Sequence, residues 1–434
     1  MNPGDAGLVE ATNDIWIWNG TSWYNSGPLT GPAGPTGATG APGAGVIPGG
    51  TTGQILAKAS ATDYDTEWIA APSGGGSGPL YGGSGANTAK WRAALQRVRT
   101  SPTGRARIIC AGTSNTFGWG PATPATMNWP ELLRQNIQNR LGIKTAWGPE
   151  PLNKFSVDGI DPGVVNERPW FTKGGWNMSP FAYWSDQGGS EGEPGQGDGP
   201  TFTMNVTDGF SFLYIDRTAG RTFQYKVDSG TATTITTTGS NLTKEVRVPV
   251  GAAGTHTLTL LNPTGGTAIV PAIGADVNNG ITVCNWGVPG GMIGALHRDQ
   301  GQYWSGLEVL KGAAPDLVVL EVGANDVGTT TAASYKTSLE TIIDFIQANT
   351  AASVILCETY ATDQVAGAPF VTAAREVAVA KGVDLVSLMD VMQGSRDPWR
   401  APGDPDHMTR EGQELWAQAF TEIVLGTTPR QLLT

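Results

Sequence analysis

Cysteine and histidine are scarce in this chain, which limits the kinds of site that it can build. Three cysteines and three histidines occur among 434 residues. Three cysteines cannot all pair with one another, and no spacing of cysteine and histidine typical of a metal site is present. Each cysteine lies in a short apolar run, which predicts a buried free thiol at Cys110, Cys284 and Cys357. We therefore expect neither a disulfide nor a bound metal, and no cofactor.

Basic residues and long apolar runs are scarce as well. Lysine and arginine number 27 against 38 aspartates and glutamates, which gives a formal net charge of -11. A surface with this charge repels a phosphate backbone, so nucleic acid is not an expected partner. No apolar run approaches the roughly 18 residues of a membrane-spanning helix, so no membrane insertion is expected. The N-terminus lacks a basic segment followed by an apolar one, which predicts no signal peptide.

Residues 1–79 have the composition of a fibrous stalk. Aromatic residues alternate with polar ones around an Asn-Gly pair, which predicts an attachment hairpin within residues 1–26. Only glycine fits the axis of a collagen triple helix, so a glycine at every third position of residues 27–45 favours three chains side by side; a flexible linker is the alternative. Residues 46–79 predict a small β unit and a Gly/Ser linker. The periodic glycines are Gly31, Gly34, Gly37, Gly40 and Gly43.

From about residue 80 the pattern is that of an α/β domain. Five continuous apolar runs predict buried parallel strands at residues 106–112, 280–287, 315–323, 352–360 and 383–391. Amphipathic segments between or beside these runs predict helices at residues 88–98, 129–141, 335–349, 370–382 and 410–424. The alternation of strands and helices implies a parallel sheet that is covered by helices on both faces.

The first two apolar runs lie far apart, and we expect a separate β domain between them. Residues 201–275 alternate with period two and are interrupted by glycine and asparagine, which is typical of an antiparallel β-sandwich. This sandwich would be a carbohydrate-binding unit, a spacer or a trimer contact. The α/β domain is then split into residues 80–200, which include a Trp/Gly-rich loop, and residues 276–434. Two roles are open for tryptophans of the first part, stacking on sugar rings or packing against the inserted domain: Trp147, Trp170, Trp176 and Trp184.

A serine and a later Asp-x-x-His segment are the candidate catalytic residues. Ser114 follows the first apolar run, at the edge where open α/β sheets bind ligands, although such a serine alone is more often a helix cap. The segment DPDH at residues 404–407 offers an imidazole and a carboxylate from one turn, as activation of a serine hydroxyl requires. Asp404 is preferred to Asp406 because a turn brings positions i and i+3 together.

Two further turns offer donors for the negative oxygen that forms when an ester is attacked. Asn325 follows the third apolar run and carries a side-chain amide. Gly290 lies in the glycine-rich segment after the second run, where glycine lets a backbone N–H approach closely; Gly287 is the alternative. Either turn alone is more often structural. The remaining histidines, His256 and His297, lie in strand-like and helix-like segments and are expected to be structural.

In chain order these segments resemble the four blocks that define SGNH (GDSL-like) hydrolases. The resemblance implies a nucleophile at Ser114, an acid–base pair at Asp404 and His407, and an oxyanion hole formed by Ser114, Gly290 and Asn325. It also implies a flavodoxin-like three-layer α/β fold and a serine esterase that requires no metal. The first block differs from the family's Gly-Asp-Ser, because a threonine precedes the serine.

Residues 1–72 resemble a second kind of protein, the stalks of bacteriophage tail fibres. The resemblance rests on collagen-like triplets followed by GGTTGQILAKASATDYDTEW. It implies a homotrimer joined through the stalk, attachment to other phage tail proteins at the N-terminus, and a virion protein that is made in the host cytoplasm and acts outside the cell. The expected activity is removal of O-acetyl groups from host cell-surface polysaccharide. The alternatives are a receptor-binding adhesin or structural fibre with a vestigial hydrolase domain, and a secreted short-chain lipase or esterase.

Overall fold

The computed structural model of the chain falls into two units, Met1–Gly76 and Ser77–Thr434. The structure describes residues 1–28, 54–58, 66–70, 80–82, 87–120, 124–152, 171–172, 174–178, 190–261, 263–264, 266–302, 304–358, 364–394, 397–400, 403–404 and 406–427. The predicted collagen-like triplets, together with Trp170 and Trp184, lie outside these ranges. No helix within them combines the length and the hydropathy that crossing a bilayer requires.

The first unit contains two small antiparallel sheets. Its strands are β1 (Ala6–Val9), β2 (Asp14–Trp18), β3 (Trp23–Pro28), β4 (Gln54–Lys58) and β5 (Thr66–Ala70). The first three pair in chain order, and β4 pairs with β5. The side chain of Asn19 accepts hydrogen bonds from the backbone N–H groups of Thr21 and Ser22, both at 2.9 Å. This local pairing closes the turn between β2 and β3, where the alternating aromatic residues predicted a hairpin.

The second unit is built on a seven-stranded sheet with the order β6-β24-β23-β22-β7-β21-β8. It contains the five predicted strands, β7 (Arg105–Gly112), β21 (Gly280–Gly287), β22 (Leu317–Glu321), β23 (Ser353–Cys357) and β24 (Asp384–Val386). All five are parallel, and numbered along the chain they have the flavodoxin-like order 2-1-3-4-5. Two short edge strands were not predicted, the parallel β8 (Thr145–Trp147) and the antiparallel β6 (Leu80–Tyr81).

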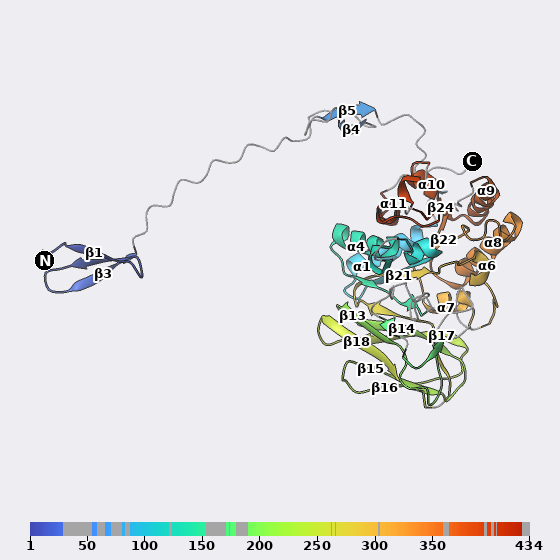
Figure 1. The fold of residues 1–434 in the computed structure, drawn as a ribbon, viewed down its shortest axis with the longest axis horizontal. Helices are drawn as coiled ribbons and strands as arrows, with labels where there is room; N and C mark the ends of the chain where they lie inside the picture. Colours follow the sequence, from blue (N-terminus) through green and yellow to red (C-terminus); the bar gives the residue numbers. More distant parts are fainter. Residues whose placement is uncertain are drawn as a thin grey trace. The chain divides into compact units, whose positions relative to one another are not determined.

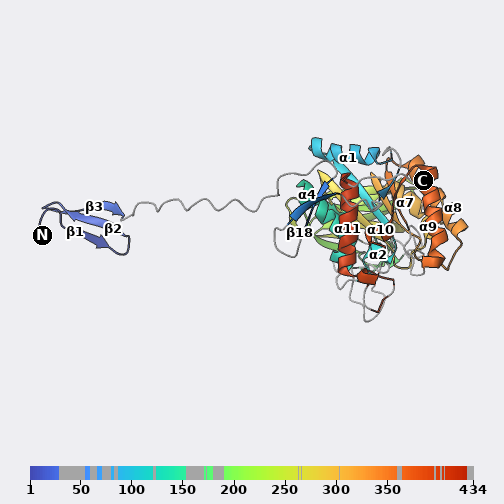
Figure 2. The same cartoon turned by 90° about the horizontal axis from the view of Figure 1, so that it is seen from above.

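Helices cover both faces of this sheet, as the alternation of strands and helices predicted. One face is covered by α1 (Ala89–Thr100), α4 (Trp129–Leu141) and α11 (Arg410–Leu425). The other is covered by α7 (Gly306–Gly312), α8 (Ala332–Asn349) and α9 (Gln364–Lys381). Successive residues of β7 serve the two cores in turn, because strand side chains alternate: Ile108 faces α1, and Ile109 faces α8. Figures 1 and 2 show α8 and α9 side by side.

Short helical turns complete the described part of this unit. They are α2 (Ser114–Phe117), α3 (Pro124–Met127), α6 (Ile293–Leu296), α10 (Leu388–Val391) and the 3-10 turn η1 (Asp397–Trp399). The longer helix α11 begins at the cap Thr409, whose hydroxyl accepts from the N–H of Gly412 at 3.3 Å. It ends at Gly426, whose φ of 76° is a conformation that favours glycine.

The three cysteines lie in strands of the parallel sheet and are buried and free, as predicted. Burial raises the pKa of Cys110 and Cys357 well above its usual value. It raises the pKa of Cys284 to about 12. Because the thiolate is the reactive form, these side chains act as apolar core residues rather than as nucleophiles.

Between β8 and β21 the chain forms antiparallel sheets. Their orders are β10-β13-β18-β15-β16, β17-β14-β20-β9 and β11-β12-β19. The strands are β9 (Glu150–Pro151), β10 (Phe171–Thr172), β11 (Asn177–Met178), β12 (Ser190–Gly192), β13 (Thr201–Val206), β14 (Gly209–Asp216), β15 (Thr222–Val227), β16 (Thr233–Thr236), β17 (Leu242–Pro249), β18 (Gly254–Leu261), β19 (Ala268–Val270) and β20 (Ala272–Asp276). Strands from before residue 201 therefore take part in these sheets.

The strand β14 lies between two hydrophobic cores. All eight of its residues are buried. Phe210, Phe212 and Tyr214 share a core with residues of the five-stranded sheet. Leu213 and Ile215 belong instead to the core beneath α7 and α8. The four-stranded sheet therefore packs against the α/β part on one face and against the five-stranded sheet on the other.

Candidate active site

Ser114 lies where β7 ends and the chain turns sharply into α2. The N–H of Phe117 donates to the carbonyl of Thr113 at 3.0 Å and closes the turn. The turn packs so closely on β21 that a Cβ atom at Gly287 would lie 2.1 Å from the nitrogen of Phe117. Gly287 therefore serves this close approach, and its own N–H donates to Asn285 Oδ1 at 2.9 Å. It is the wrong choice for an oxyanion donor, because that N–H is already used.

The Asp404–His407 turn meets Ser114 directly. His407 Nε2 lies 2.9 Å from Ser114 Oγ, and His407 Nδ1 lies 2.7 Å from Asp404 Oδ2. A carboxylate only accepts hydrogen bonds, so Nδ1 carries the proton and Nε2 is left to accept from the serine hydroxyl. Asp404 Oδ1 accepts from the backbone N–H groups of Asp406 at 2.9 Å and His407 at 3.1 Å. Asp404, rather than Asp406, is thus the carboxylate that holds the imidazole.

Asp404 is kept in its ionised form. Its partial burial favours the neutral acid, but hydrogen bonds from the Asp406 backbone and from His407 outweigh this, and the pKa of Asp404 lies below its usual value. The side chain of Asp404 is 33% exposed and that of His407 is 19% exposed, whereas Ser114 is 7% exposed. The ring of Trp119 lies 5.9 Å from that of His407. The serine is therefore deeper than its partners, with an aromatic ring beside the imidazole.

The residue after Ser114 holds the segment that carries His407. Asn115 Nδ2 donates to the carbonyl of Asp406 at 3.0 Å, and its Oδ1 accepts from the N–H of Met408 at 3.1 Å. One carboxamide thus binds the backbone on both sides of His407. The sequence analysis missed this residue, because nothing local distinguishes an asparagine that binds a distant backbone from one that caps a turn.

The segments after β7, β21 and β22 meet at the same edge of the sheet. The N–H of Val288 donates to the carbonyl of Gly112, the last residue of β7, at 3.0 Å. Asn325 Nδ2 donates to the carbonyl of Gly291 at 3.0 Å. Gly290 between them is exposed and has a φ of 72°, a conformation that favours glycine. The predicted donors Gly290 and Asn325 therefore come from two neighbouring turns that are hydrogen-bonded together.

The glycine-rich turn is also held by Asp326. This carboxyl group is 2% exposed and accepts from the N–H of Ile293, with the shorter contact at 3.1 Å. Burial raises the pKa of Asp326 to about 6, although the Ile293 hydrogen bond opposes the rise. A carboxyl group that titrates near neutrality therefore lies beside the oxyanion candidates.

The later part of the chain matches a known protein family. Residues 252–415 match the GDSL-like Lipase/Acylhydrolase family. The matched residues include Gly290, Asn325, Asp404 and His407, and they form a GDSL-like acylhydrolase domain. Ser114 lies outside the match, and the fold brings it to the histidine of this domain. No curated protein matches the chain.

The chain is also similar to several solved structures. A peptidoglycan O-acetylesterase superposes with a TM-score of 0.60 at 19% identity, over 80% of this chain and 100% of its own. A lipase/acylhydrolase from Enterococcus faecalis is 26% identical over 35% of this chain and 80% of its own, with a TM-score of 0.29. A family two carbohydrate esterase from Clostridium thermocellum is 16% identical over 59% of this chain and 98% of its own, with a TM-score of 0.27. The first of these shows that the chain shares the fold of that solved structure.

Sugar stacking, one of the two roles left open for four tryptophans, is wrong for the two that the structure describes. Trp147 is 5% exposed, and its indole N–H donates to Glu150 Oε2 at 2.7 Å. The residue lines a cavity of about 290 Å³ together with Arg134 and Thr145. Trp176 is 0% exposed and lies in the core of the antiparallel sheets. Neither indole offers an open face to a sugar ring, because burial of a large apolar surface outweighs exposure in both cases.

The other two histidines of the chain have structural partners. His256 Nδ1 lies 2.7 Å from Asp228 Oδ2 on the antiparallel sheets, and the carboxylate raises the pKa of His256. His297 Nε2 lies 2.9 Å from Ser338 Oγ, between α6 and α8. Both were predicted to be structural. Within the described ranges, no group of three or more histidines, cysteines, aspartates and glutamates is placed to hold a metal ion.

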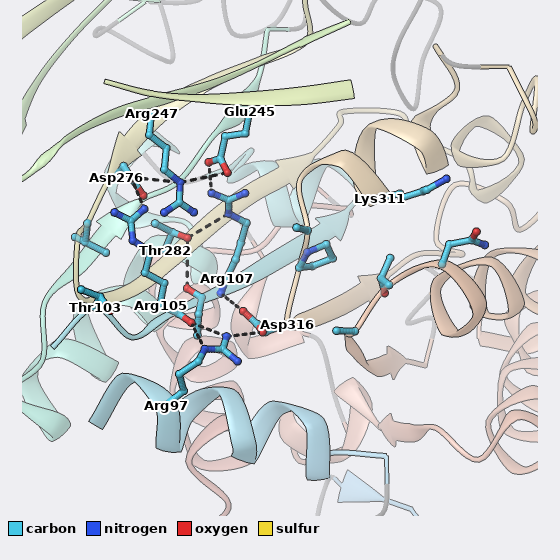
Figure 3. A pocket seen from close by; sticks show the side chains of 18 residues that line it. Arg97, Thr103, Arg105, Arg107, Glu245, Arg247, Asp276, Thr282, Lys311 and Asp316 are labelled. Atoms are coloured by element: carbon cyan, nitrogen blue, oxygen red, sulfur yellow. Dashed lines mark hydrogen bonds and ion pairs between the residues drawn. The ribbon is translucent and has the colours of Figure 1, made fainter. Parts of the chain in front are cut away.

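A second cavity, of about 470 Å³, lies at the opposite edge of the parallel sheet from Ser114. Figure 3 shows guanidinium groups around it, each beside a carboxylate. Burial raises the pKa of Asp276 in this cavity, although its hydrogen bond with Arg105 opposes the rise. The network of ion pairs links the four-stranded sheet to β7 and α1. Its ion pairs are Arg97–Asp316, Arg105–Asp276, Arg107–Glu245, Arg247–Glu245 and Arg247–Asp276.

Proposed function

We propose that this chain is a serine esterase that removes O-acetyl groups from a bacterial surface polysaccharide. The observation that carries the proposal is the continuous hydrogen-bonded series from Asp404 through His407 to Ser114. A serine hydroxyl is a weak nucleophile until a base takes its proton, and an imidazole held in one tautomer by a carboxylate is such a base. The family match of residues 252–415 supports ester chemistry at this site.

The proposed reaction proceeds through a covalent ester on the serine. Ser114 Oγ attacks the acetyl carbonyl carbon while its proton moves to His407 Nε2, and Asp404 stabilises the imidazolium. The carbonyl oxygen becomes negative and is stabilised by the N–H groups of Ser114 and Gly290 and the amide of Asn325. His407 then gives its proton to the sugar oxygen, which leaves as an alcohol. Water repeats the same steps, releases acetate and restores Ser114.

Two observations outside the catalytic residues support a polysaccharide substrate on a cell surface. The neighbour with the same fold at a TM-score of 0.60 is a peptidoglycan O-acetylesterase, which supports an acetylated glycan as the substrate class. The glycine triplets at Gly31, Gly34, Gly37, Gly40 and Gly43 support a fibrous, trimeric stalk. We accordingly propose that the esterase acts at the end of a phage tail fibre, which is anchored to other tail proteins through its N-terminus.

The deciding experiment measures acetate released from purified polysaccharides by the full chain and by its Ser114→Ala variant. Capsular polysaccharide, lipopolysaccharide and peptidoglycan, each with and without prior chemical de-O-acetylation, serve as substrates. We expect release from at least one acetylated glycan, none from its deacetylated form, and none from the variant. Release by Ser114→Ala would contradict the assignment of the nucleophile.

Chain-length preference on p-nitrophenyl esters distinguishes an acetylesterase from a lipase. We expect the acetate ester to be hydrolysed faster than esters of eight carbons or more. Ser114-dependent hydrolysis that rises with acyl length would favour the lipase alternative. Binding to a glycan with no Ser114-dependent turnover on any ester would favour the adhesin with a vestigial site.

A further inference from the structure

A buried carboxylate supports the turn that carries the candidate nucleophile. Glu321, the last residue of β22, is 1% exposed. Its Oε2 accepts from the N–H of Thr113 at 2.9 Å, from the Thr113 hydroxyl at 2.9 Å and from the Thr116 hydroxyl at 2.7 Å. These residues flank Ser114, one directly before it and one two positions after it. A Cβ atom at Gly112 would lie 2.7 Å from Oε2, so the glycine makes room for the carboxylate.

The donors in this network have little choice of direction. The N–H of Thr113 can only donate, and the indole N–H of Trp129 donates to Thr116 Oγ1 at 3.2 Å. Because that indole has no acceptor to offer, the Thr116 hydroxyl sends its own hydrogen to Glu321. The Thr113 hydroxyl lies within reach of both oxygens of the carboxylate, at 2.9 and 3.2 Å. Glu321 Oε2 therefore accepts from both the Thr113 N–H and the Thr116 hydroxyl, which fits an ionised carboxylate.

We propose that Glu321 is a positioning residue for the esterase reaction, which holds Ser114 at hydrogen-bonding distance from His407. The inference rests on the proposed function of the site. In this chain the carboxylate comes from the neighbouring strand β22, and the residue before the serine is the threonine that binds it. The base of the nucleophile turn is thus tied to one strand by Glu321, while Asn115 ties the same turn to the segment around His407.

The expected effect is a loss of turnover without a loss of substrate binding. Removal of the carboxylate leaves a buried N–H and two hydroxyls to find new partners, and the turn shifts as they do so. A displacement of about 1 Å at a catalytic group costs on the order of 10²-fold in rate. We therefore expect Glu321→Ala to lower kcat by roughly 30- to 100-fold with KM changed less than about twofold. Glu321→Gln retains one acceptor oxygen and should recover part of the loss.

The test measures kcat and KM on p-nitrophenyl acetate for the full chain and for Glu321→Gln, Glu321→Ala and Ser114→Ala. Glu358→Gln is the matched control, because Glu358 directly follows the neighbouring strand β23, is 3% exposed and pairs with Arg375 instead. Circular dichroism and thermal unfolding identify variants that have not folded. If Glu321→Ala does not fold, the isosteric Glu321→Gln carries the measurement.

The expected order of kcat is wild type and Glu358→Gln first, then Glu321→Gln, then Glu321→Ala. A folded Glu321 variant series with kcat within about twofold of wild type would overturn the inference and leave the proposed function intact. An equal loss in Glu358→Gln would also overturn it, since any buried carboxylate would then have the same effect. Wild-type protein without Ser114-dependent hydrolysis would overturn the proposed function and this inference together.

Discussion

Ser114 Oγ and His407 Nε2 lie 2.9 Å apart, although 293 positions separate the two residues in the chain. The intervening chain builds the antiparallel sheets of this unit and five strands of the seven-stranded sheet before it returns to the nucleophile. The serine is presented by the end of β7, and the histidine by the segment before α11. The contact therefore depends on packing of the whole unit rather than on any local motif, and its parts can be tested separately.

The role of Asp404 predicts a large difference between two neighbouring aspartates. Asp404→Asn keeps the shape of the side chain but allows the amide to donate to His407 Nδ1, which would turn the imidazole to the wrong tautomer. We expect kcat to fall on the order of 10³- to 10⁴-fold. The matched control, Asp406→Asn, should stay within a few fold of wild type, because the Asp406 side chain is exposed and its backbone contacts remain. Steady-state hydrolysis of p-nitrophenyl acetate provides the measurement; similar losses in the two variants would contradict the assignment.

Asn115 predicts that the acid–base segment loosens when one side chain is changed. Asn115→Ala removes both hydrogen bonds to the backbone around His407 and should lower kcat by roughly 10- to 100-fold. Asn115→Asp keeps the acceptor for the Met408 N–H but loses the donor to the Asp406 carbonyl, so an equal or greater loss is expected. Amide hydrogen exchange of residues 404–408 should rise in both variants. Unchanged hydrogen exchange together with unchanged kcat would show that the two Asn115 hydrogen bonds have no role in holding His407.

Asp326 predicts a pH-dependent stability that disappears on substitution. Its folded pKa of about 6 exceeds its ordinary value of 3.8, so the folded state binds this proton more tightly than the unfolded state. The resulting stabilisation is complete below about pH 4 and is lost as the pH rises through 6; a two-unit shift corresponds to about 3 kcal/mol at most. Asp326→Asn cannot ionise and still accepts from Ile293. The free energy of unfolding in urea, measured at pH 4.5 and 7.5, should be higher for the variant relative to wild type at pH 7.5 than at pH 4.5. The same difference between the two proteins at both pH values would contradict the raised pKa of Asp326.

The ion pairs at the far edge of the sheet predict a stability effect without a catalytic one. The side chain of Arg107 is 6% exposed and lies 2.5 Å from Glu245. Arg107→Met leaves the largely buried Glu245 carboxylate with only its longer contact to Arg247, at 3.4 Å, and should lower the free energy of unfolding by up to about 3 kcal/mol. Combining Arg107→Met with Glu245→Met should restore most of this loss. Arg247→Ala removes a side chain that is 42% exposed and should cost about 0.5 kcal/mol or less. Chemical denaturation measures the free energy of unfolding of all three variants. A lower kcat in correctly folded Arg107→Met would contradict the prediction, because it would show that these ion pairs affect the reaction at Ser114.

The core strands of the hydrolase were predictable because each is a continuous apolar run that ends in a turn. The flavodoxin-like parallel sheet followed from the resemblance to SGNH hydrolases, and the observed strand order 2-1-3-4-5 agrees with it. The edge strands β6 and β8, of two and three residues, were missed because so short a segment has no periodicity to detect. For Trp147 and Trp176 the composition left sugar stacking and packing both open, and burial of their large apolar surfaces decides for packing.

Site residues that belong to one of the four sequence blocks could be found in the sequence. Site residues whose partners are distant in the chain could not. The choice of Asp404 over Asp406 needed only the geometry of a turn. Glu321 had one available signal, a carboxylate at the end of the apolar run LVVLE, where an unpaired charge would be costly. Its partner could not be named in advance, because Thr113 lies 208 positions away.

The two-sided burial of β14 means that the antiparallel region is not a detachable accessory. Its deletion would expose to water the apolar residues of the parallel sheet and its helices that share a core with Leu213 and Ile215. A different domain inserted at this position would have to cover the same apolar surface. Changes to the outer loops and strands of this region should therefore be tolerated better than changes to β14.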